Sequence, residues 1–270
     1  MASSNTLLGT VAAIWRYPVK SMAGEQLDAV EIGSAGLLGD RGRALREVAT
    51  GAIVCAKNPR KWATLLDCRA TYSAPPNAAR PVPPVVITLP DGTRISSDSP
   101  DAPRQLSRYF GREVALHGAP AEGQQIEMML PNDPTEQVLE VPIPPEGFFD
   151  LAAVHLLTTA SVQALAAAAP ASRFDIRRFR PNLVIETPAG RVGFVENDWI
   201  GRTLWIGDDV ELAIFRPCGR CIMTTVPQGD LPKDVGVLRA IAERNDANFG
   251  VYATVVTPGR VERGARVELR

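Results

Sequence analysis

The sequence predicts a mixed α/β protein that is rich in β structure. Two observations support this fold class: the 270 residues include 22 glycines and 23 prolines, and short Val/Ile/Leu runs recur between turn signals. With 45% hydrophobic and 22% charged residues, the composition is that of an ordinary globular protein. The length suits one large domain or two small ones. We expect a β-barrel-like domain over residues 9–118, a connecting segment over 119–150 and a second domain over 151–270.

The first half is predicted to consist of strands joined by turns. Alternating apolar residues predict a strand that ends at Pro18, and Gly36 and Gly39 lie in a turn between two further strands. Another strand and a turn at Pro59 follow. An Asp-Gly turn joins two more strands, and residues 101–111 predict a short amphipathic helix closed by a glycine. This half therefore resembles a small barrel or sandwich.

The second half begins after a connection rich in proline and polar residues. A helix is predicted to start near Thr159 with Ser/Thr capping and to stop at Pro170. Residues 178–190, 201–217 and 220–230 are predicted to supply strands. A second helix is expected before Gly250, and a closing hairpin around Pro258-Gly259. These elements complete a β-rich domain with few helices.

Charge and the N-terminus limit the classes of partner. Lys+Arg total 29 and Asp+Glu total 30, a formal net charge of −1, so neither nucleic acid nor an anionic membrane surface is indicated. The first 20 residues have no basic region, and their apolar stretch is too short for a signal peptide or a membrane span. We expect a cytoplasmic protein.

Two of the four cysteines, Cys218 and Cys221, form a Cys-x-x-Cys. Structural zinc needs four ligands, and neither the other two cysteines nor the two histidines, His117 and His155, are spaced as a second ligand pair. A thioredoxin-type dithiol needs its first cysteine at a helix start, and "IMTTV" after Cys221 is β-branched. Burial as apolar filler is an equally good reading. Against it, the neighbouring arginines 216 and 220 favour a thiolate, which suits a metal carrying oxo groups or an anionic cofactor.

Basic residues beside small polar groups recur at predicted strand ends. "YPVKS" contains Lys20 and Ser21, "GDRGR" contains Arg41, and "RRFRPN" contains Arg177, Arg178, Arg180 and Asn182. Each basic residue can be read as a solvated turn residue, or, for the arginine cluster, as a surface face paired with nearby carboxylates. One internal phosphate-bearing ligand would explain them all together.

The order of six motifs resembles a known family. Tyr-Pro-Val-Lys-Ser, Gly-Asp-Arg, Arg-Pro-Asn, Trp-x-Gly, Pro-Cys-x-Arg-Cys and Gly-x-Tyr follow one another along the chain. In this order they resemble the MOSC domain, named for the C-terminal region of molybdenum-cofactor sulfurases, preceded by the MOSC N-terminal β-barrel domain. The resemblance covers roughly residues 9–270 and implies a barrel in each domain.

The resemblance implies a binder of molybdenum cofactor (molybdenum with molybdopterin). Relatives include mitochondrial amidoxime-reducing components, which are molybdenum oxidoreductases that reduce N-hydroxylated small molecules. It implies that Cys221 is both catalytic and the metal ligand. The cofactor contacts implied by matching positions are Lys20, Ser21, Arg41, Thr158, Thr159, Arg180, Asn182, Gly219, Arg220 and Tyr252. Cys218 is expected to pack or to contact the site indirectly.

The resemblance also leaves alternatives. Family proteins are associated with pyridoxal phosphate as well. No ferredoxin-like tail follows the last strand, so a separate electron donor of ferredoxin or flavoprotein type is expected. A non-catalytic carrier of molybdenum cofactor or sulfur, or a dithiol exchanger using Cys218 and Cys221, remains open.

Overall fold

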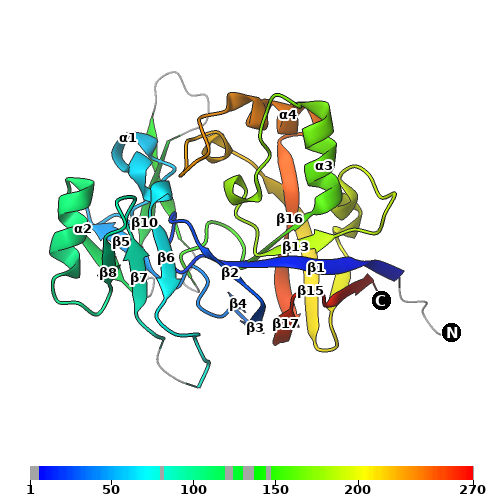
Figure 1. The fold of residues 1–270 in the computed structure, drawn as a ribbon, viewed down its shortest axis with the longest axis horizontal. Helices are drawn as coiled ribbons and strands as arrows, with labels where there is room; N and C mark the ends of the chain where they lie inside the picture. The colour runs from blue at the N-terminus through cyan, green and yellow to red at the C-terminus, as the bar shows by residue number, and fades with distance from the viewer. Residues whose placement is uncertain (1–5, 80–81, 119–123, 130–136, 144–146, 270) are drawn as a thin grey trace.

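A closed barrel of seven strands forms the larger half of the molecule (Figure 1). The computed structural model describes residues 6–79, 82–118, 124–129, 137–143 and 147–269. Neighbouring barrel strands are hydrogen-bonded in the order β13-β12-β16-β15-β14-β18-β1, and β1 closes the ring by pairing with β13. Their bounds are β1 Thr6–Arg16, β12 Val154–Thr158, β13 Leu183–Glu186, β14 Thr203–Ile206, β15 Val210–Gly219, β16 Asn248–Thr257 and β18 Arg266–Leu269.

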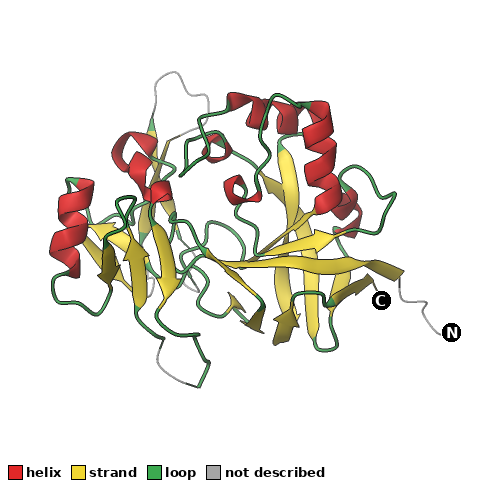
Figure 2. Cartoon of the chain, in the orientation of Figure 1, coloured by secondary structure: helices red, strands yellow, loops and turns green. Residues whose placement is uncertain are grey.

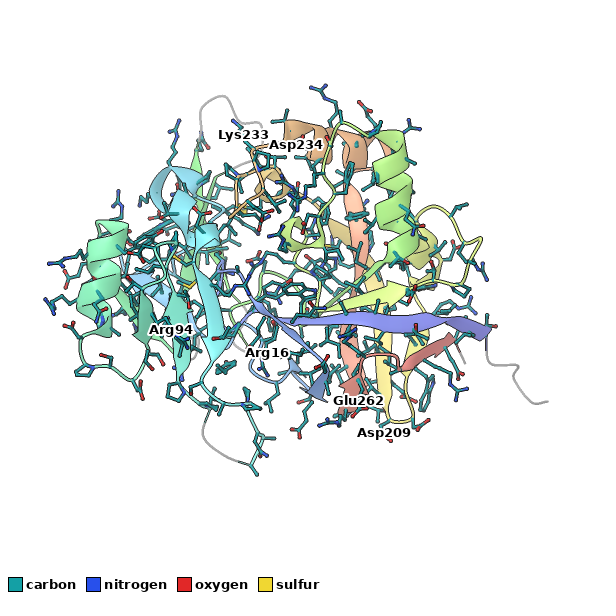
Figure 3. All side chains as sticks on the ribbon, in the orientation of Figure 1. Arg16, Arg94, Asp209, Lys233, Asp234 and Glu262 are labelled. Atoms are coloured by element: carbon teal, nitrogen blue, oxygen red, sulfur yellow. The ribbon has the colours of Figure 1, made fainter. Side chains whose placement is uncertain are left out.

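The first strand of the chain is thus part of a barrel whose other strands come from the second half. Buried and less buried residues alternate along β1, and Val11 and Ile14 enter the same apolar core as Leu212 and Val251. This alternation is the period-two pattern of a strand with one face in a core. Closure leaves the seven described barrel strands without a free sheet edge. The chain crosses from the barrel to the other half at Arg16, labelled in Figure 3.

The N-terminal half contains smaller sheets around a second core (Figure 2). One sheet is formed by β6 Arg69–Tyr72, β7 Val85–Thr88 and β8 Arg94–Ser96, and another pair by β5 Ala44–Glu47 and β9 Val114–His117. The short helix α2, Ala102–Phe110, ends at Gly111, whose φ of 65° is left-handed. Trp62 and Leu65 are fully enclosed in this core. The predicted fold class, a β-rich mixed protein with a few helices, is confirmed.

Helices α3 (Thr159–Ala168) and α4 (Val235–Asn245) lie together at one end of the barrel. Figure 3 shows Lys233 and Asp234 at this end and Asp209 and Glu262 at the opposite one. The Thr158 side chain caps α3 by accepting from Ser161 N, and the Asp234 side chain caps α4 by accepting from Gly236 N. Both helices therefore begin where a side-chain oxygen satisfies a free backbone N–H. None of the helices in the described residues is long and apolar enough to cross a membrane.

Four predicted elements differ from the structure. Pro59 begins helix α1 (Pro59–Trp62), because proline is well suited to a first helical turn. Part of the connecting segment pairs as the antiparallel strands β10 (Gln125–Met129) and β11 (Val138–Pro142); other parts of it lie outside the described residues. The predicted strand after Cys221 is instead the 3₁₀ helix η4, Ile222–Thr224.

The predicted closing hairpin is also wrong. After β16 the chain leaves the barrel, and β17 (Gly259–Glu262) pairs with β3 (Ala29–Gly33) of the other half of the sequence. Val261 packs into the barrel core from there. β3 in turn pairs with β4 (Gly36–Leu37), and β2 (Glu25–Leu27) pairs with β1. The two halves of the sequence are therefore joined by backbone hydrogen bonds, and the predicted boundaries at residues 118 and 151 stay predictions.

Candidate functional site

A cavity of ≈ 380 Å³ is lined by residues from both halves of the chain. Its volume lies within the usual range for small-molecule sites. Most of the residues selected from the sequence line it, although they are up to 232 positions apart in the chain. They are Lys20, Ser21, Arg41, Arg180, Asn182, Gly219, Arg220, Cys221 and Tyr252.

Thr158 and Thr159 are not among the residues that line this cavity. Thr158 Oγ1 donates to Glu196 Oε2 at 2.6 Å while it caps α3. Thr159 Oγ1 lies 3.4 Å from Thr187 Oγ1. The Thr158 hydroxyl holds the helix start and the Thr159 hydroxyl also accepts from Thr187 N at 3.2 Å, so their placement does not support the predicted contact with a cofactor.

The backbone is strained at three of the cavity residues. Ser21, Arg41 and Arg180 have φ values of 64°, 48° and 54°, in the left-handed region that costs a residue with a side chain of order 1 kcal/mol. Hydrogen bonds to other parts of the chain anchor two of these residues: Arg41 N donates to Tyr17 O at 2.7 Å, and Ala56 N donates to Ser21 Oγ at 3.1 Å. Such strain concentrates at functional sites, where the surrounding structure compensates for it.

Tyr17 holds two of the strained arginines close together. The guanidinium carbons of Arg41 and Arg180 lie 4.8 and 4.2 Å from the centre of its ring. Arg41 is ion-paired with Asp40, and Arg180 Nη1 donates to Met22 O at 2.6 Å. Burial, followed by the charge of Arg41, lowers the pKa of Arg180 to about 10. Arg180 Nη2 is buried without a hydrogen-bond partner among the described residues. An anionic ligand would accept a hydrogen bond from this atom and would offset the charge repulsion between Arg41 and Arg180.

Two lysines and one aspartate form a second charged group in the wall. Lys20 Nζ lies 2.6 Å and Lys57 Nζ 3.0 Å from the Asp150 carboxylate. The Asp150 side chain keeps 40% exposure because it lines the cavity. Desolvation would raise its pKa, but the two lysine charges outweigh that effect and hold the pKa well below its usual range. Two cations on one carboxylate leave a net positive charge facing the cavity.

The two cysteines of the Cys-x-x-Cys differ in their surroundings. Cys221 is partly exposed in the cavity wall, whereas Cys218 is fully buried. Arg220 Nη1 donates to Cys218 Sγ at 2.7 Å, and Arg220 Nη2 donates to Phe179 O at 3.0 Å. Burial alone would raise the pKa of Cys218, but Arg220, with smaller contributions from His155 and Tyr252, lowers it to about 6. These surroundings favour the thiolate form of the buried Cys218, which is bound to the adjacent Arg220 guanidinium.

The arginine cluster of the sequence divides between three roles. Arg177 is a surface residue paired with Asp175 and Asp230. Arg178 is buried and donates to backbone carbonyls, including Pro232 O at 2.7 Å. The reading as a surface residue paired with carboxylates is therefore correct for Arg177 and wrong for Arg178, which is buried and lines the cavity. Of the three arginines, Arg180 is the one that keeps an unpartnered donor among the described residues.

Sequence reasoning missed several cavity residues. Lys57 and Asp150 were given no role, Arg216 was considered only as a cation that favours a thiolate, and Cys55 was weighed only as a zinc ligand. Cys55 is buried, and Ser21 Oγ donates to its sulfur at 3.8 Å. The partners Lys20 and Asp150 are 130 residues apart, which a single sequence does not reveal. The sequence offered one hint of this pairing, the carboxylate of Asp150 at the end of the proline-rich connection.

Comparison with known proteins agrees with this architecture. The profile of the MOSC N-terminal beta barrel domain matches residues 8–73, and that of the MOSC domain matches residues 144–268. The mitochondrial amidoxime reducing component 2 of Rattus norvegicus is 25% identical over 240 residues, which are 81% of this chain and 67% of that protein. Molybdenum cofactor sulfurase 3 of Aedes aegypti is 37% identical over 87 residues, 32% of this chain but only 11% of that protein.

A solved structure supports the fold over the whole chain. The YuaD protein of Bacillus subtilis superposes with a TM-score of 0.50 at 12% identity, covering 98% of this chain and 97% of that one. The two profile matches together span most of the sequence and confirm the resemblance seen in its motifs. The chain therefore contains a MOSC N-terminal beta barrel domain followed by a MOSC domain.

Proposed function

We propose that this protein binds molybdenum cofactor in the cavity between its halves and reduces N-hydroxylated small molecules. The observation that carries the proposal is the meeting of one partly exposed thiol, Cys221, with surplus positive charge from both halves in a single cavity. The similarity to proteins named for amidoxime reduction and for molybdenum cofactor supports the same reading.

The residues present fit such a group. A pterin phosphate is an anion, and the buried Arg180 Nη2 lacks an acceptor among the described residues. Molybdenum accepts soft sulfur ligands, and the cavity wall offers Cys221. Within the described residues, no three His, Cys, Asp or Glu side chains are grouped to hold a metal ion. The proposal therefore requires the cofactor to bring its own dithiolene sulfurs.

The roles of the protein side chains follow from their placement. Lys20, Arg41 and Arg180 would hold the phosphate and the pterin, and Cys221 would be the protein's ligand to the metal. Asp150 keeps Lys20 and Lys57 in place across the cavity. The Cys218 thiolate fixes the Arg220 guanidinium beside Cys221. Tyr252, whose pKa is raised by burial and by the neighbouring Cys218 charge, stays protonated at neutral pH.

The bound cofactor would supply two-electron reduction. Converting an amidoxime to an amidine consumes two electrons and two protons, and the oxygen leaves as water. The electrons would come from a separate donor protein of ferredoxin or flavoprotein type. The lysines and arginines of the wall would keep the anionic cofactor bound through both one-electron transfers.

Turnover of benzamidoxime by cofactor-loaded protein with a small-molecule electron donor tests the proposal. Cys221→Ala is expected to abolish turnover because the metal loses its protein ligand. Cys68→Ala is the matched control, since Cys68 is buried in the N-terminal core and does not line the cavity. Full activity in Cys221→Ala would remove the ligand assignment. Bound cofactor without turnover in the wild type would indicate a cofactor carrier instead.

A further inference from the structure

Arg216 is a cation in the cavity wall that neither the fold nor the proposed cofactor contacts account for. It lies on β15, opposite Tyr252 of β16, and both residues line the cavity. The register of this strand pair shifts between Ile214 and Arg216. Such a bulge turns the following side chain toward a different face, and bulges are frequent beside binding sites.

The other cations of the wall all have protein partners. Lys20 and Lys57 bind Asp150, Arg41 binds Asp40, and Arg220 binds Cys218. The two remaining arginines donate to backbone carbonyls: Arg178 to Pro232 O, and Arg180 to Met22 O.

Among the described residues, the Arg216 side chain has neither a hydrogen-bond partner nor an ion pair, and the residue is exposed. An exposed arginine is usually a solvated surface residue. Arg216, however, lies in the wall of a cavity that already carries surplus positive charge, where its guanidinium can bind an anionic ligand. A guanidinium presented into a cavity with its donors free is the standard partner for a carboxylate or a phosphate.

The neighbouring surface is apolar and aromatic. Phe215, 42% exposed, stacks on Tyr252 with an interplanar angle of 19° and a centroid distance of 6.4 Å. Leu151, 47% exposed, lines the cavity as well. A ligand at Arg216 would thus meet a positive charge beside apolar surface, which suits an organic anion more than a bare inorganic one.

We propose that Arg216 is a specificity-determining residue that selects N-hydroxylated substrates carrying an anionic group, a carboxylate or a phosphate. This inference rests on the proposed reductase function and names its substrate class. In a productive complex the anionic group would contact Arg216 while the N–O group faces Cys221. Neutral substrates would be bound without this contact.

Two matched probes test the inference: benzamidoxime, which is neutral, and 4-carboxybenzamidoxime, which carries a carboxylate. With cofactor-loaded protein, the wild type is expected to bind the carboxylate compound more tightly in calorimetry and to show a lower KM for it. Arg216→Gln is expected to weaken binding of the carboxylate compound about fivefold, the loss of one partly exposed charge-assisted hydrogen bond. Its affinity for benzamidoxime should change less than about twofold, and Arg216→Lys should keep part of the preference.

A second arginine controls for net charge. Arg260 lies on β17 in a surface pair with Glu262 and does not line the cavity, so Arg260→Gln should leave both affinities unchanged. Raising the salt concentration should remove the wild-type preference and leave Arg216→Gln unaffected.

Three outcomes would overturn the inference. Equal affinity of the wild type for the two probes would show that the anionic group is not recognised. An equal loss for both probes in Arg216→Gln would show a general effect on the site. A fall in molybdenum and pterin content in Arg216→Gln would assign the residue to the cofactor. Because calorimetry reports binding without turnover, absence of benzamidoxime reduction would contradict the proposed function and still leave the preference measurable.

Discussion

At the scale of single residues, the buried Cys218 thiolate is the most unusual group. The negatively charged form is favoured in a fully enclosed position because Arg220 donates to the sulfur at 2.7 Å. The sequence predicted that the arginines would favour a thiolate, but it did not say at which of the two cysteines. Only the structure distinguishes the two sulfurs, because their difference lies in burial and in the direction of the Arg220 side chain.

The first prediction concerns the pH dependence of stability. The pKa of Cys218 falls from a usual value of 9.0 to about 6 in the folded protein, so its contribution is fully present above about pH 9 and is lost as the pH falls through 6. The free energy of unfolding of the wild type minus that of Cys218→Ser should therefore rise between pH 6 and pH 9. The steepest possible slope is about 1.4 kcal/mol per pH unit. Urea denaturation at several pH values measures it, and a difference independent of pH would contradict the thiolate assignment.

Individual site residues were predicted from motifs with uneven success. Lys20, Arg41 and Cys221 do lie in one cavity wall. They could be selected from the sequence because their motifs combine residue types suited to binding anions and metals. Lys57 and Asp150 were missed because they form an ion pair with each other across 93 positions of the chain, and a single sequence does not reveal such a contact. Whether any of them binds cofactor stays a prediction.

At the scale of elements, the start of α3 explains why two threonines were assigned to the site. The Ser/Thr pattern that correctly predicted the helix start is the same pattern that matched a cofactor-contact position. In the structure Thr158 uses its oxygen for Ser161 N and its proton for the buried Glu196. A sequence pattern can predict that a residue caps a helix, but it does not predict whether that residue also faces the cavity.

The second prediction separates the two roles of Thr158. Thr158→Ala removes the cap and a hydrogen bond to a buried carboxylate, so the free energy of unfolding should fall by about 1–2 kcal/mol. Molybdenum and pterin content per folded chain should not change. Thr159→Ala, next to it, should cost less, about 1 kcal/mol, since its hydroxyl contacts only Thr187: it lies 3.4 Å from Thr187 Oγ1 and accepts from Thr187 N at 3.2 Å. Loss of cofactor without loss of stability in Thr158→Ala would restore the assignment made from the sequence.

The third prediction concerns Gly250 in β16. The sequence placed it beyond a helix end, but α4 ends at Asn245, and Gly250 lies in the strand that pairs with β12. Its φ is 81°, and an added Cβ would lie 2.5 Å from Leu156 O and 2.3 Å from His155 Nε2.

Gly250→Ala should therefore lower the free energy of unfolding by more than about 2 kcal/mol. Gly264 has a φ of 83°, and a Cβ added there would meet no atom within 4 Å, so Gly264→Ala should cost only about 1 kcal/mol. Thermal unfolding of both variants gives the comparison. Equal losses of unfolding free energy in the two variants would mean that the close approach of β16 to β12 at Gly250 does not affect stability.

At the scale of the whole molecule, the two halves depend on each other. The composition and turn signals predicted a β-rich fold, and that was confirmed. The sequence did not reveal that β1 closes the barrel of the other half, because strand pairing between residues more than 160 positions apart leaves no local pattern. The same long-range pairing brings Lys20, which follows β1, to the cavity.

The fourth prediction follows from this closure. A chain of residues 147–270 alone lacks β1, so β13 and β18 would each expose an unpaired edge and the core would lose Val11 and Ile14. We expect this fragment to aggregate or to unfold without cooperativity in circular dichroism. The full chain should unfold cooperatively. A cooperative transition in the fragment would show that the second half is an independent domain.

The central claim is that both halves form one site for one molybdenum cofactor. Metal analysis of the purified full chain, together with the fluorescence of its oxidised pterin, tests this most directly. We predict molybdenum and pterin in equal amounts, approaching one of each per chain, and a loss of both in Arg41→Ala and in Arg180→Ala, whose side chains come from different halves. A protein that contains neither, after expression in a host that makes the cofactor, would contradict the account.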